Sequence, residues 1–285
     1  MKLAKDKKIL IVGLGLLGGS YARALTAQGF NVTAVTKEQA SVDFALREKI
    51  IAGGSTTANE KTVGEADIII FALYPHIFKE WIKENAYLIK KGAVITDVTG
   101  VKSSIVYEIQ ELLPEGVEFI AAHPMAGREV GGVENSTAEI FKGANYIVVP
   151  TAQNTAEAIE LCKELGITLG FADVSVLSPE RHDEMIAFLS QLTHCIAVSL
   201  MCANDDPDLT RYTGDSFRDL TRIARINEEM WSELFLENRE QLLSQMDAFR
   251  QSFEEMYLSV RDGNVEKMKQ MMRTSTVRRA RFDKK

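Results

Sequence analysis

Residues 8–20 read Lys-Ile-Leu-Ile-Val-Gly-Leu-Gly-Leu-Leu-Gly-Gly-Ser. An apolar run enters a Gly-x-Gly-x-x-Gly turn, and a helical pattern over residues 21–28 leaves it. In this order Gly13 permits a tight turn, Gly15 lets the backbone approach a pyrophosphate, and Gly18 lets the helix pack closely on the strand. The stretch therefore predicts a dinucleotide site; the alternative is a tight turn in another α/β fold. The residues expected to line the cofactor here are Gly13, Leu14, Gly15, Leu16, Leu17 and Gly18.

The alternation of strand and helix continues through the first half of the chain. Strand-like apolar runs lie at 31–35, 66–73, 93–98, 119–122 and 146–149, with one more near 172–176. Helical patterns lie between several of them, at 39–48, 78–89, 104–113 and 155–165. Repeated units of this kind predict an α/β fold with a Rossmann-type, doubly wound parallel sheet.

After Ser178 the pattern becomes helical. Ser178 and Pro179 are typical of a helix N-cap and first helical position, and the helix to about Cys202 is apolar around most of its circumference, so we expect it to be buried. A second helical pattern runs over 228–261. Its length, roughly 50 Å, favours an all-helical domain that also forms a dimer interface; the alternative is two helices separated by a kink. We place a dinucleotide-binding domain at 1–177 and a helical substrate and dimerisation domain at 178–285.

Composition narrows the class of protein. The chain has 285 residues, of which 46% are hydrophobic, and a net charge of −7, which argues against general nucleic-acid binding. We see no signal-peptide core and no apolar run that approaches the roughly 20 residues needed to span a bilayer. The three cysteines, Cys162, Cys195 and Cys202, form no metal-type pair and are expected to be buried free thiols. We therefore expect a cytoplasmic protein without a metal site, a nucleic-acid partner or a membrane partner.

The end of the second predicted strand bears on cofactor choice. NAD-selective folds usually place an acid there, to bind the ribose 2′-hydroxyl. This chain has Thr36 and Lys37, with Glu38 one residue later. A hydroxyl followed by a cation suits a 2′-phosphate, which favours NADP slightly over NAD. The alternative is that Lys37 points into solvent and Glu38 reaches the ribose.

His123 stands out among the four histidines. It follows a buried strand, at the edge of the sheet where α/β folds bind ligands, and lies in the segment His-Pro-Met-Ala-Gly-Arg-Glu of residues 123–129. A neutral imidazole can take a proton from an alcohol while hydride leaves the same carbon, so His123 is a candidate base.

That segment, with Gly131 and Gly132 behind it, resembles the signature of the prephenate/arogenate dehydrogenases of tyrosine biosynthesis. The resemblance covers nearly the whole chain: it includes the glycine loop, Asp-Val-Thr-Gly-Val-Lys at 97–102, Ser-Pro-Glu-Arg-His-Asp at 178–183, Ser-Gln-Leu-Thr-His at 190–194 and Phe-Arg-Asp-Leu-Thr-Arg-Ile-Ala at 217–224. Several separate motifs in the same order make it far more specific than the glycine loop alone.

The resemblance implies an oxidoreductase that oxidatively decarboxylates prephenate to 4-hydroxyphenylpyruvate, arogenate to tyrosine, or both, as a homodimer using NAD or NADP. His123 matches the family histidine that hydrogen-bonds the ring hydroxyl, and Arg222 the arginine that holds a substrate carboxylate. His194 matches a residue near the substrate side chain. From spacing alone, Asp219 lies three residues before Arg222 and shares its face if the segment is helical, so it is expected to orient that arginine; the alternative is an ordinary surface ion pair. The loop of Leu73, Tyr74 and Pro75 resembles the one on the adenosine side of the cofactor.

The sequence departs from the family pattern at two positions. Many members carry a serine, which bridges nicotinamide and substrate hydroxyl, where this chain has Gly100; either Thr99 supplies that hydroxyl or the contact is absent. Some members have histidine where this chain has Gln191, and a neutral amide suits both prephenate and arogenate.

Two other functions remain open from the sequence. One is another two-domain NAD(P)-dependent hydroxyacid or imine dehydrogenase. The other is a non-catalytic dinucleotide sensor, which the missing serine at Gly100 favours and the presence of both His123 and Arg222 opposes.

Overall fold

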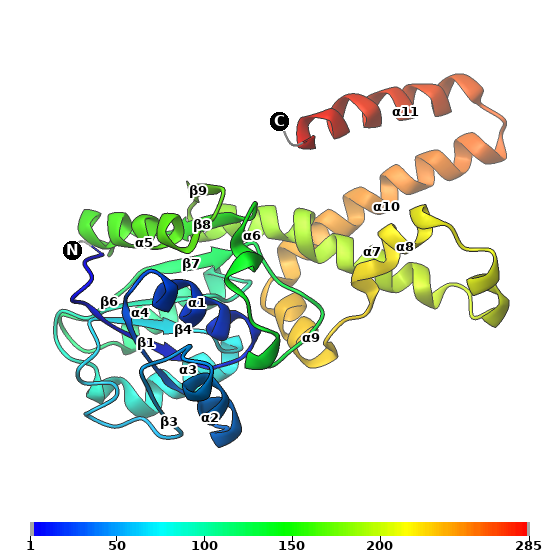
Figure 1. Ribbon diagram of the computed structural model, residues 1–285. Helices are drawn as coiled ribbons and strands as arrows, with labels where there is room; N and C mark the ends of the chain where they lie inside the picture. Colours follow the sequence, from blue (N-terminus) through cyan, green and yellow to red (C-terminus); the bar gives the residue numbers. More distant parts are fainter. Residues whose placement is uncertain (1–2, 284–285) are drawn as a thin grey trace.

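The computed structural model describes residues 3–283, and a six-stranded parallel sheet forms the centre of its N-terminal part (Figure 1). The strand order is β3-β2-β1-β4-β5-β6, the order of the Rossmann-type fold, so the predicted fold class is confirmed. The strands are β1 (Lys8–Val12), β2 (Asn31–Val35), β3 (Gly53–Ser55), β4 (Ile68–Phe71), β5 (Val94–Asp97) and β6 (Glu118–Phe119).

Both faces of this sheet are covered by helices. Ile9 and Ile11 of β1 belong to the core cluster on the side of α1 (Leu16–Ala27), α2 (Gln39–Arg47) and α5 (Ala156–Leu169). The intervening Leu10 and Val12 belong to the cluster on the side of α3 (Pro75–Asn85) and α4 (Ser103–Leu112). Because successive side chains of a strand point to opposite faces, a strand covered on both sides must be apolar throughout. This explains the continuous apolar runs in the sequence.

The last three strands do not extend the parallel sheet as expected. β7 (Ala121–Pro124), β8 (Asn145–Val149) and β9 (Asp173–Val176) form a separate sheet in which β7 and β8 are antiparallel. Residues 125–144, which join β7 to β8, contain only short 3-10 turns. A parallel return needs a crossover connection, usually a helix, and only the next connection has one, in α5 between β8 and the parallel β9.

The C-terminal part begins with one continuous helix made of α6 (Pro179–Ile186), a π-helical turn (Ala187–Gln191) and α7 (Leu192–Cys202). The predicted cap is confirmed, because the Ser178 side chain accepts a hydrogen bond from the Arg181 amide at 3.2 Å. The expected burial is wrong along much of its length: Phe188 is 52% and Leu189 47% exposed in the single chain.

By length and composition alone, this helix could also cross a membrane, contrary to the expectation that no run reaches that length. Its first turns nevertheless contain the buried polar residues His182 and Asp183, and Asp183 accepts hydrogen bonds from backbone amides of the N-terminal part. These contacts dock the beginning of the helix against the parallel sheet and its helices.

The helix predicted over 228–261 is two helices, α9 (Glu228–Glu237) and α10 (Arg239–Arg261). The chain leaves helical geometry at Asn238, with φ −119° and ψ 27°. The Asn238 amide is buried there and donates to the Asp183 carbonyl at 2.9 Å and to Gln191 Oε1 at 2.8 Å. The alternative of two helices is therefore the correct one. The break between them places the Asn238 side chain as a buried hydrogen-bond donor.

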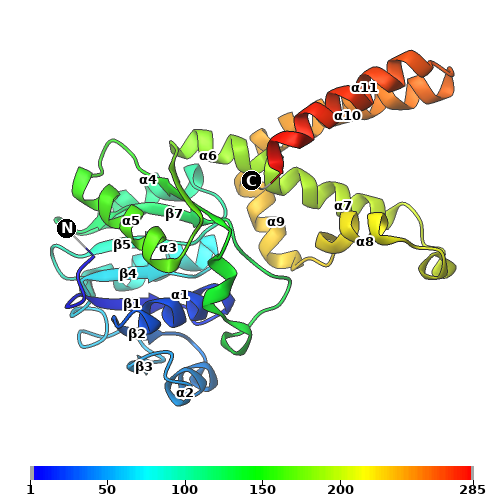
Figure 2. The same cartoon turned by 45° about the horizontal axis from the view of Figure 1, so that its top comes forward.

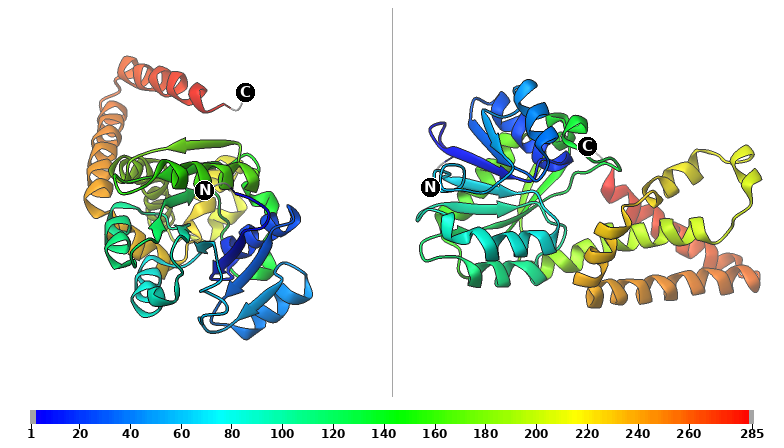
Figure 3. Two further views of the ribbon diagram at one scale, coloured as in Figure 1. Left: turned by 90° about the vertical axis from the view of Figure 1, so that its left-hand side faces the viewer. Right: turned by 90° about the horizontal axis from the view of Figure 1, so that it is seen from below.

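The remaining helices extend the C-terminal part away from the sheets. They are α8 (Asp215–Thr221), which packs on α7, and α11 (Val265–Arg279), which contacts α10 after the turn that joins them. Figure 2 shows both helices extending away from the sheets, and the left view of Figure 3 shows them diverging from that turn.

Candidate active site

The carboxyl ends of the parallel strands bring the glycine loop against its neighbouring loops. Gly13 has φ +98°, and its amide donates to the Val35 carbonyl of β2 at 2.8 Å. A Cβ at Gly13 would lie 2.5 Å from the Ala72 carbonyl oxygen and 2.9 Å from Leu73 Cδ2. The turn therefore requires glycine, and it places the ends of β1, β2 and β4 together.

The other side of the loop is open. A Cβ at Gly15 would meet nothing within 4 Å, and Gly15 is the N-cap of α1 without a side-chain cap. The first amides of α1 are therefore left for an outside acceptor, and a helix N-terminus favours an anion. The loop from Gly13 to Gly18 thus fits the pyrophosphate of a dinucleotide.

The loops after β2 and β4 flank this surface. Thr36 is partly exposed, with its amide bonded to the Ser55 carbonyl at 3.1 Å, and Lys37 is exposed. Tyr74, in the loop Leu73–Tyr74–Pro75, accepts a hydrogen bond from Asn227 Nδ2 at 3.3 Å. The structure brings both predicted cofactor segments to the carboxyl edge of the sheet.

Helix α9 holds the start of α3. One oxygen of the Glu233 carboxylate accepts from the His76 amide at 2.7 Å, and the other lies 2.8 Å from His76 Nδ1. A carboxylate at a helix N-terminus is favourable for the free amides and the helix dipole. This contact joins the helical part to the loop after β4.

A buried ion pair lies at the end of β5. Lys102 is fully buried, and its Nζ donates to Asp97 Oδ2 and to the Ala122 carbonyl, both at 2.7 Å, and to Thr99 Oγ1 at 3.1 Å. Burial lowers the pKa of Lys102, and the Asp97 carboxylate opposes that shift. Asp97 Oδ1 also accepts from the Ala122 amide at 3.1 Å, so this pair fixes both peptide groups of Ala122, the residue before His123.

Thr99 belongs to this buried cluster. It is 4% exposed, and its hydroxyl donates to Asp97 Oδ2. Next to it, a Cβ at Gly100 would lie 3.4 Å from the Leu234 side chain, an ordinary contact, so packing does not require glycine there.

His123 lies on β7 beside that cluster and is partly exposed. Its Nδ1 is 2.9 Å from His182 Nε2, and His182 Nδ1 is 2.8 Å from Asp183 Oδ1. Nε2 of His123 has no hydrogen-bond partner among residues 3–283. Burial, and then the neighbouring His182 and Lys102, hold the pKa of His123 well below its usual value. The imidazole is therefore neutral at neutral pH, with Nε2 available to a ligand.

The predicted substrate residues Arg222 and His194 lie on the helical side. Arg222, in a 3-10 turn after α8, pairs through Nη1 with Glu129 Oε1 at 2.6 Å, whereas Asp219 had been expected to orient it. Glu129 ends the segment that starts at His123, so this ion pair brings Arg222 to the His123 loop. His194 Nδ1 lies 2.8 Å from the Ser190 carbonyl, and its ring lies against Trp231 with centroids 3.7 Å apart.

Gln191 is not brought to an open surface. It is 1% exposed, its Nε2 donates to the Leu234 carbonyl at 2.8 Å, and its Oε1 accepts from Asn238. In this structure it ties the π-helical turn to α9 and α10.

The sequence reasoning missed the contact between His123 and His182, because the two residues are 59 positions apart. The adjacent pair His182-Asp183 appears above only as the end of the motif at residues 178–183. Two polar residues on a helix expected to be buried were the available signal, since buried polar groups need partners.

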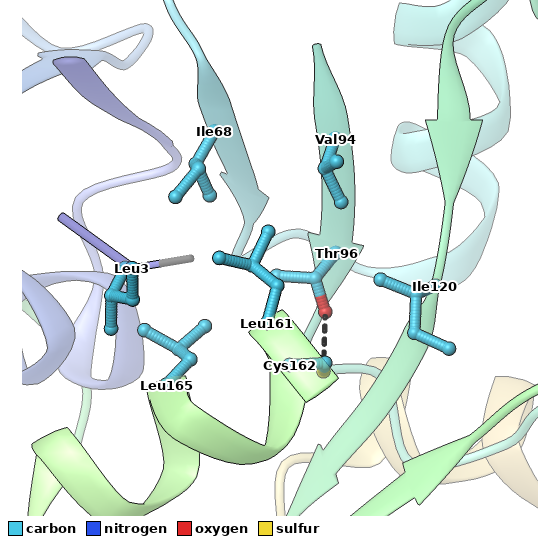
Figure 4. A pocket seen from close by; sticks show the side chains of 8 residues that line it. All are labelled: Leu3, Ile68, Val94, Thr96, Ile120, Leu161, Cys162 and Leu165. Atoms are coloured by element: carbon cyan, nitrogen blue, oxygen red, sulfur yellow. Dashed lines mark hydrogen bonds between the residues drawn. The ribbon is translucent and has the colours of Figure 1, made fainter. Parts of the chain in front are cut away.

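A cavity of about 10 Å³ lies elsewhere, between α5 and the sheet (Figure 4). Leu161 and Ile68 line it, and Cys162 Sγ lies 3.8 Å from Thr96 Oγ1. Cys162 is a buried free thiol, as expected, and burial raises its pKa to about 11, which makes it unreactive. The expectation of burial is wrong for Cys202, which is exposed, and for Cys195, which is partly exposed.

Comparisons with known proteins agree with this arrangement. A family model described as prephenate dehydrogenase, nucleotide-binding domain, matches residues 21–171, and one described as prephenate dehydrogenase, dimerization domain, matches residues 178–274. The prephenate dehydrogenase of Lactococcus lactis is 33% identical over 264 residues, 89% of this chain and 71% of that protein. The cyclohexadienyl dehydrogenase of Zymomonas mobilis is 30% identical over 250 residues, 85% of each.

A solved structure shows the same likeness. The crystal structure of prephenate dehydrogenase from A. aeolicus, in complex with hydroxyphenyl propionate and NAD+, has a TM-score of 0.89 and 28% identity, and covers 99% of this chain and 100% of that one. The alternatives of another dehydrogenase class or a sensor are not favoured. From the two matching domains, these relatives and the dinucleotide-binding geometry, we conclude that the chain belongs to the prephenate dehydrogenase family.

Proposed function

We propose that this enzyme carries out the NAD(P)-dependent oxidative decarboxylation of prephenate, arogenate or both, with His123 as the base. The observation that carries the assignment of the base is the position of His123. Its neutral ring is held through Nδ1, and Nε2 is left without a partner among residues 3–283, next to the edge of the sheet that bears the glycine loop.

The chemistry follows from that position. His123 Nε2 accepts the proton of the ring hydroxyl as hydride leaves the carbon that bears it. The bound nicotinamide supplies the hydride acceptor. The ring carboxylate leaves as carbon dioxide, and its electron pair completes the aromatic ring as a phenolate, which takes the proton back from the base to become the phenol. Aromatisation provides the driving force, so the protein mainly has to position the substrate and hold one proton during the reaction.

Arg222 and His194 complete the substrate side of the proposed site. The Arg222 guanidinium already binds a carboxylate, that of Glu129, and the same planar fork suits a carboxylate of the substrate. Asp183 and Lys102 remain behind His123 and do not need to touch the substrate.

For two of the predicted site residues, Thr99 and Gln191, the hydrogen bonds favour a positioning role over direct binding. The Thr99 hydroxyl is bonded to Asp97, which favours a positioning role over direct contact with cofactor and substrate. The buried Gln191 is likewise better suited to holding α9 in place than to binding substrate. The Gly100 position then has no hydroxyl in the role of the family serine.

Three broader expectations accompany the proposal. Residues 1–177 would hold the cofactor, and residues 178–285 would complete the substrate site and join two copies into a homodimer. The location would be cytoplasmic. The match to a dimerization-domain model and the exposed apolar side chains of that region support the dimer.

The proposal is tested by following nicotinamide absorbance with prephenate or arogenate, each combined with NAD or NADP. Reduction with at least one pair is expected. Folded protein that binds cofactor but is silent with all four pairs would contradict the proposed reaction.

The same assay tests the choice of cofactor. Lys37→Ala should raise the KM for NADP more than that for NAD, because an exposed cation at the end of β2 suits the 2′-phosphate. The matched control is Lys49→Ala, an exposed lysine just after α2. Equal effects of Lys37→Ala on both cofactors would contradict a role in binding the 2′-phosphate.

A further inference from the structure

Behind the proposed base, a chain of two hydrogen bonds leads into the protein. His123 Nδ1 meets His182 Nε2 at 2.9 Å, and His182 Nδ1 meets Asp183 Oδ1 at 2.8 Å. His182 is fully buried and Asp183 is 3% exposed. Two imidazoles and a carboxylate are thus connected in a row, and His182 and Asp183 lie away from water, an arrangement that the start of a helix does not require.

The carboxylate end of this chain is ionised. Asp183 Oδ1 accepts from the Lys102 amide at 2.9 Å, and Oδ2 accepts from the Ser103 amide at 2.8 Å. Burial raises the pKa of Asp183, but the hydrogen bonds from His182 and Ser103 outweigh it, and the pKa lies below its usual value. An ionised carboxylate only accepts hydrogen bonds, so His182 Nδ1 must carry a proton and donate it to Asp183.

The ionised Asp183 carboxylate determines the tautomers of both His182 and His123. Burial lowers the pKa of His182 even though Asp183 opposes the shift, so its ring is neutral. With a proton on Nδ1, a neutral His182 has a bare Nε2, which acts only as an acceptor. His123 must therefore donate from Nδ1, and its Nε2 is the nitrogen left bare.

The charges around the two rings favour a proton moving inward. The charged groups next to them are Asp183, Lys102 and Asp97. Lys102 and Asp97 form an ion pair at 2.7 Å, so their charges largely cancel, and Asp183 is left as the net anion. A positive charge is thus better placed on His182, in contact with Asp183, than on His123 one ring away.

We propose that His182 and Asp183 are positioning residues that act through His123 as a relay. Asp183 fixes the tautomer of His182, and His182 in turn fixes that of His123. When Nε2 of His123 accepts the substrate proton, its Nδ1 proton passes to His182 Nε2. The result is a neutral His123 and a His182 imidazolium paired with the Asp183 carboxylate. No proton is gained or lost beyond the one taken from the substrate. The relay rests on the proposed function only for the origin of that proton.

Two substitutions of His182 separate its two tasks in the relay, which are to fix the tautomer of His123 and to accept its proton. In His182→Gln, an amide oxygen can still accept from His123 Nδ1, but it cannot take the proton. His182→Phe keeps an aromatic ring and removes both nitrogens. Tyr146→Phe serves as control, because it deletes a buried polar contact, 3.6 Å from Cys162 Sγ. Tyr146 lies on the neighbouring strand β8, next to the residue that pairs with His123, so its side chain points to the opposite face of the sheet.

The first readout needs no turnover. Nitrogen NMR of protein with labelled histidine, assigned by single substitutions, should show His123 protonated at Nδ1 and bare at Nε2 in the wild type. His182→Gln and Tyr146→Phe should keep that state, whereas His182→Phe should add the Nε2-protonated form. A wild-type His123 bare at Nδ1, or one tautomer in all four proteins, would overturn the proposal.

The second readout is the pH profile of kcat, measured with the best substrate and cofactor pair. We expect kcat to fall about 10-fold in His182→Gln and about 100-fold in His182→Phe, with KM within about threefold. The acid limb should move to lower pH in both, because the added proton then has to stay on His123, where burial disfavours the charge, instead of forming the His182 ion pair with Asp183. His182 lowers the pKa of His123 only once it carries that charge itself. A base of lower pKa stays deprotonated to lower pH but accepts a proton less readily.

An unmoved acid limb, or kcat of His182→Phe equal to that of the wild type or of Tyr146→Phe, would overturn the relay. Loss of thermal stability alone, as in the control, would not move the limb. An inactive wild type would contradict the proposed reaction and leave the NMR result to decide the hydrogen-bond chain.

Discussion

The His123 ring combines burial with one free nitrogen. Burial holds its pKa well below the usual value, so the ring is a neutral base at neutral pH instead of an imidazolium. The Asp97–Lys102 ion pair forms hydrogen bonds with both peptide groups of Ala122, the residue before His123. These bonds fix the backbone of β7 and therefore the position of the His123 ring.

His123→Asn should lower kcat by about 10²- to 10⁴-fold and change KM little, because the variant loses proton transfer and keeps the polar contact to His182. Steady-state kinetics with the best substrate pair measure both constants. An unchanged kcat in a folded variant would remove His123 from the mechanism.

Arg222→Gln should raise the KM for substrate by at least about 10-fold, with a smaller effect on kcat, because a charge-assisted contact to a carboxylate is lost. The matched control is Arg218→Gln, since Arg218 is also exposed and paired, with Asp215, on the preceding helix. A normal KM with a lowered kcat would assign Arg222 to the chemical step instead.

Sequence reasoning at this scale named His123, Arg222 and His194 through motif resemblance, and the structure brings Arg222 to the His123 loop and His194 onto the facing helices. It did not predict the partners. Glu129 was not singled out, and the environments of Thr99 and Gln191 depend on residues such as Leu234 that are far away in the chain. Burial of a polar side chain is a tertiary property, which a local motif does not determine.

At the scale of elements, the strand, glycine turn and helix at the N-terminus illustrate two demands on glycine. Gly13 has a positive φ and no space for a Cβ, whereas Gly15 has an extended backbone and open space beside it. The first glycine is needed by the fold, and the second is needed only if something approaches the loop.

Gly15→Ala should leave the melting temperature within about 1 °C and raise the Kd for the cofactor at least about 10-fold, since its methyl group enters the space proposed for the pyrophosphate. Gly13→Ala, the matched change two residues earlier, should lower stability by about 1–3 kcal/mol because of backbone strain and the clash with Ala72. Thermal unfolding and cofactor titration distinguish them. Tight cofactor binding by Gly15→Ala would contradict the placement of the phosphates.

Periodicity predicted most elements but not every boundary between them. It located β1, β2, β4 and β5 because they are apolar on both faces. It could not show that β7 and β8 pair antiparallel, since strand direction depends on the connection between them. The end of α9 at Asn238 was equally hidden, because the apolar spacing continues through it, and only the buried partners of the Asn238 amide explain the break.

The two parts of the molecule differ in how completely they bury their apolar side chains. The N-terminal part buries both faces of its sheet, whereas the helical part leaves large apolar side chains in solvent in the single chain. On α10 they follow helical spacing and form a stripe, and they are Leu243, Met246, Phe249, Phe253, Tyr257 and Val260. Monomeric soluble proteins rarely expose contiguous apolar surface of this extent, so a second copy is the expected cover.

We therefore expect sedimentation velocity at micromolar concentration to give the mass of a dimer. Phe253→Glu should shift it to the monomer and lower the melting temperature, because Phe253 is 65% exposed in the single chain and a charge there would be desolvated at the interface. Tyr87→Glu is the matched control, since Tyr87 is 79% exposed but lies on the N-terminal part, and it should stay dimeric. A monomeric wild type, or a dimeric Phe253→Glu of unchanged stability, would show that the stripe is not the interface, and that the family's dimerization domain joins its copies through another face.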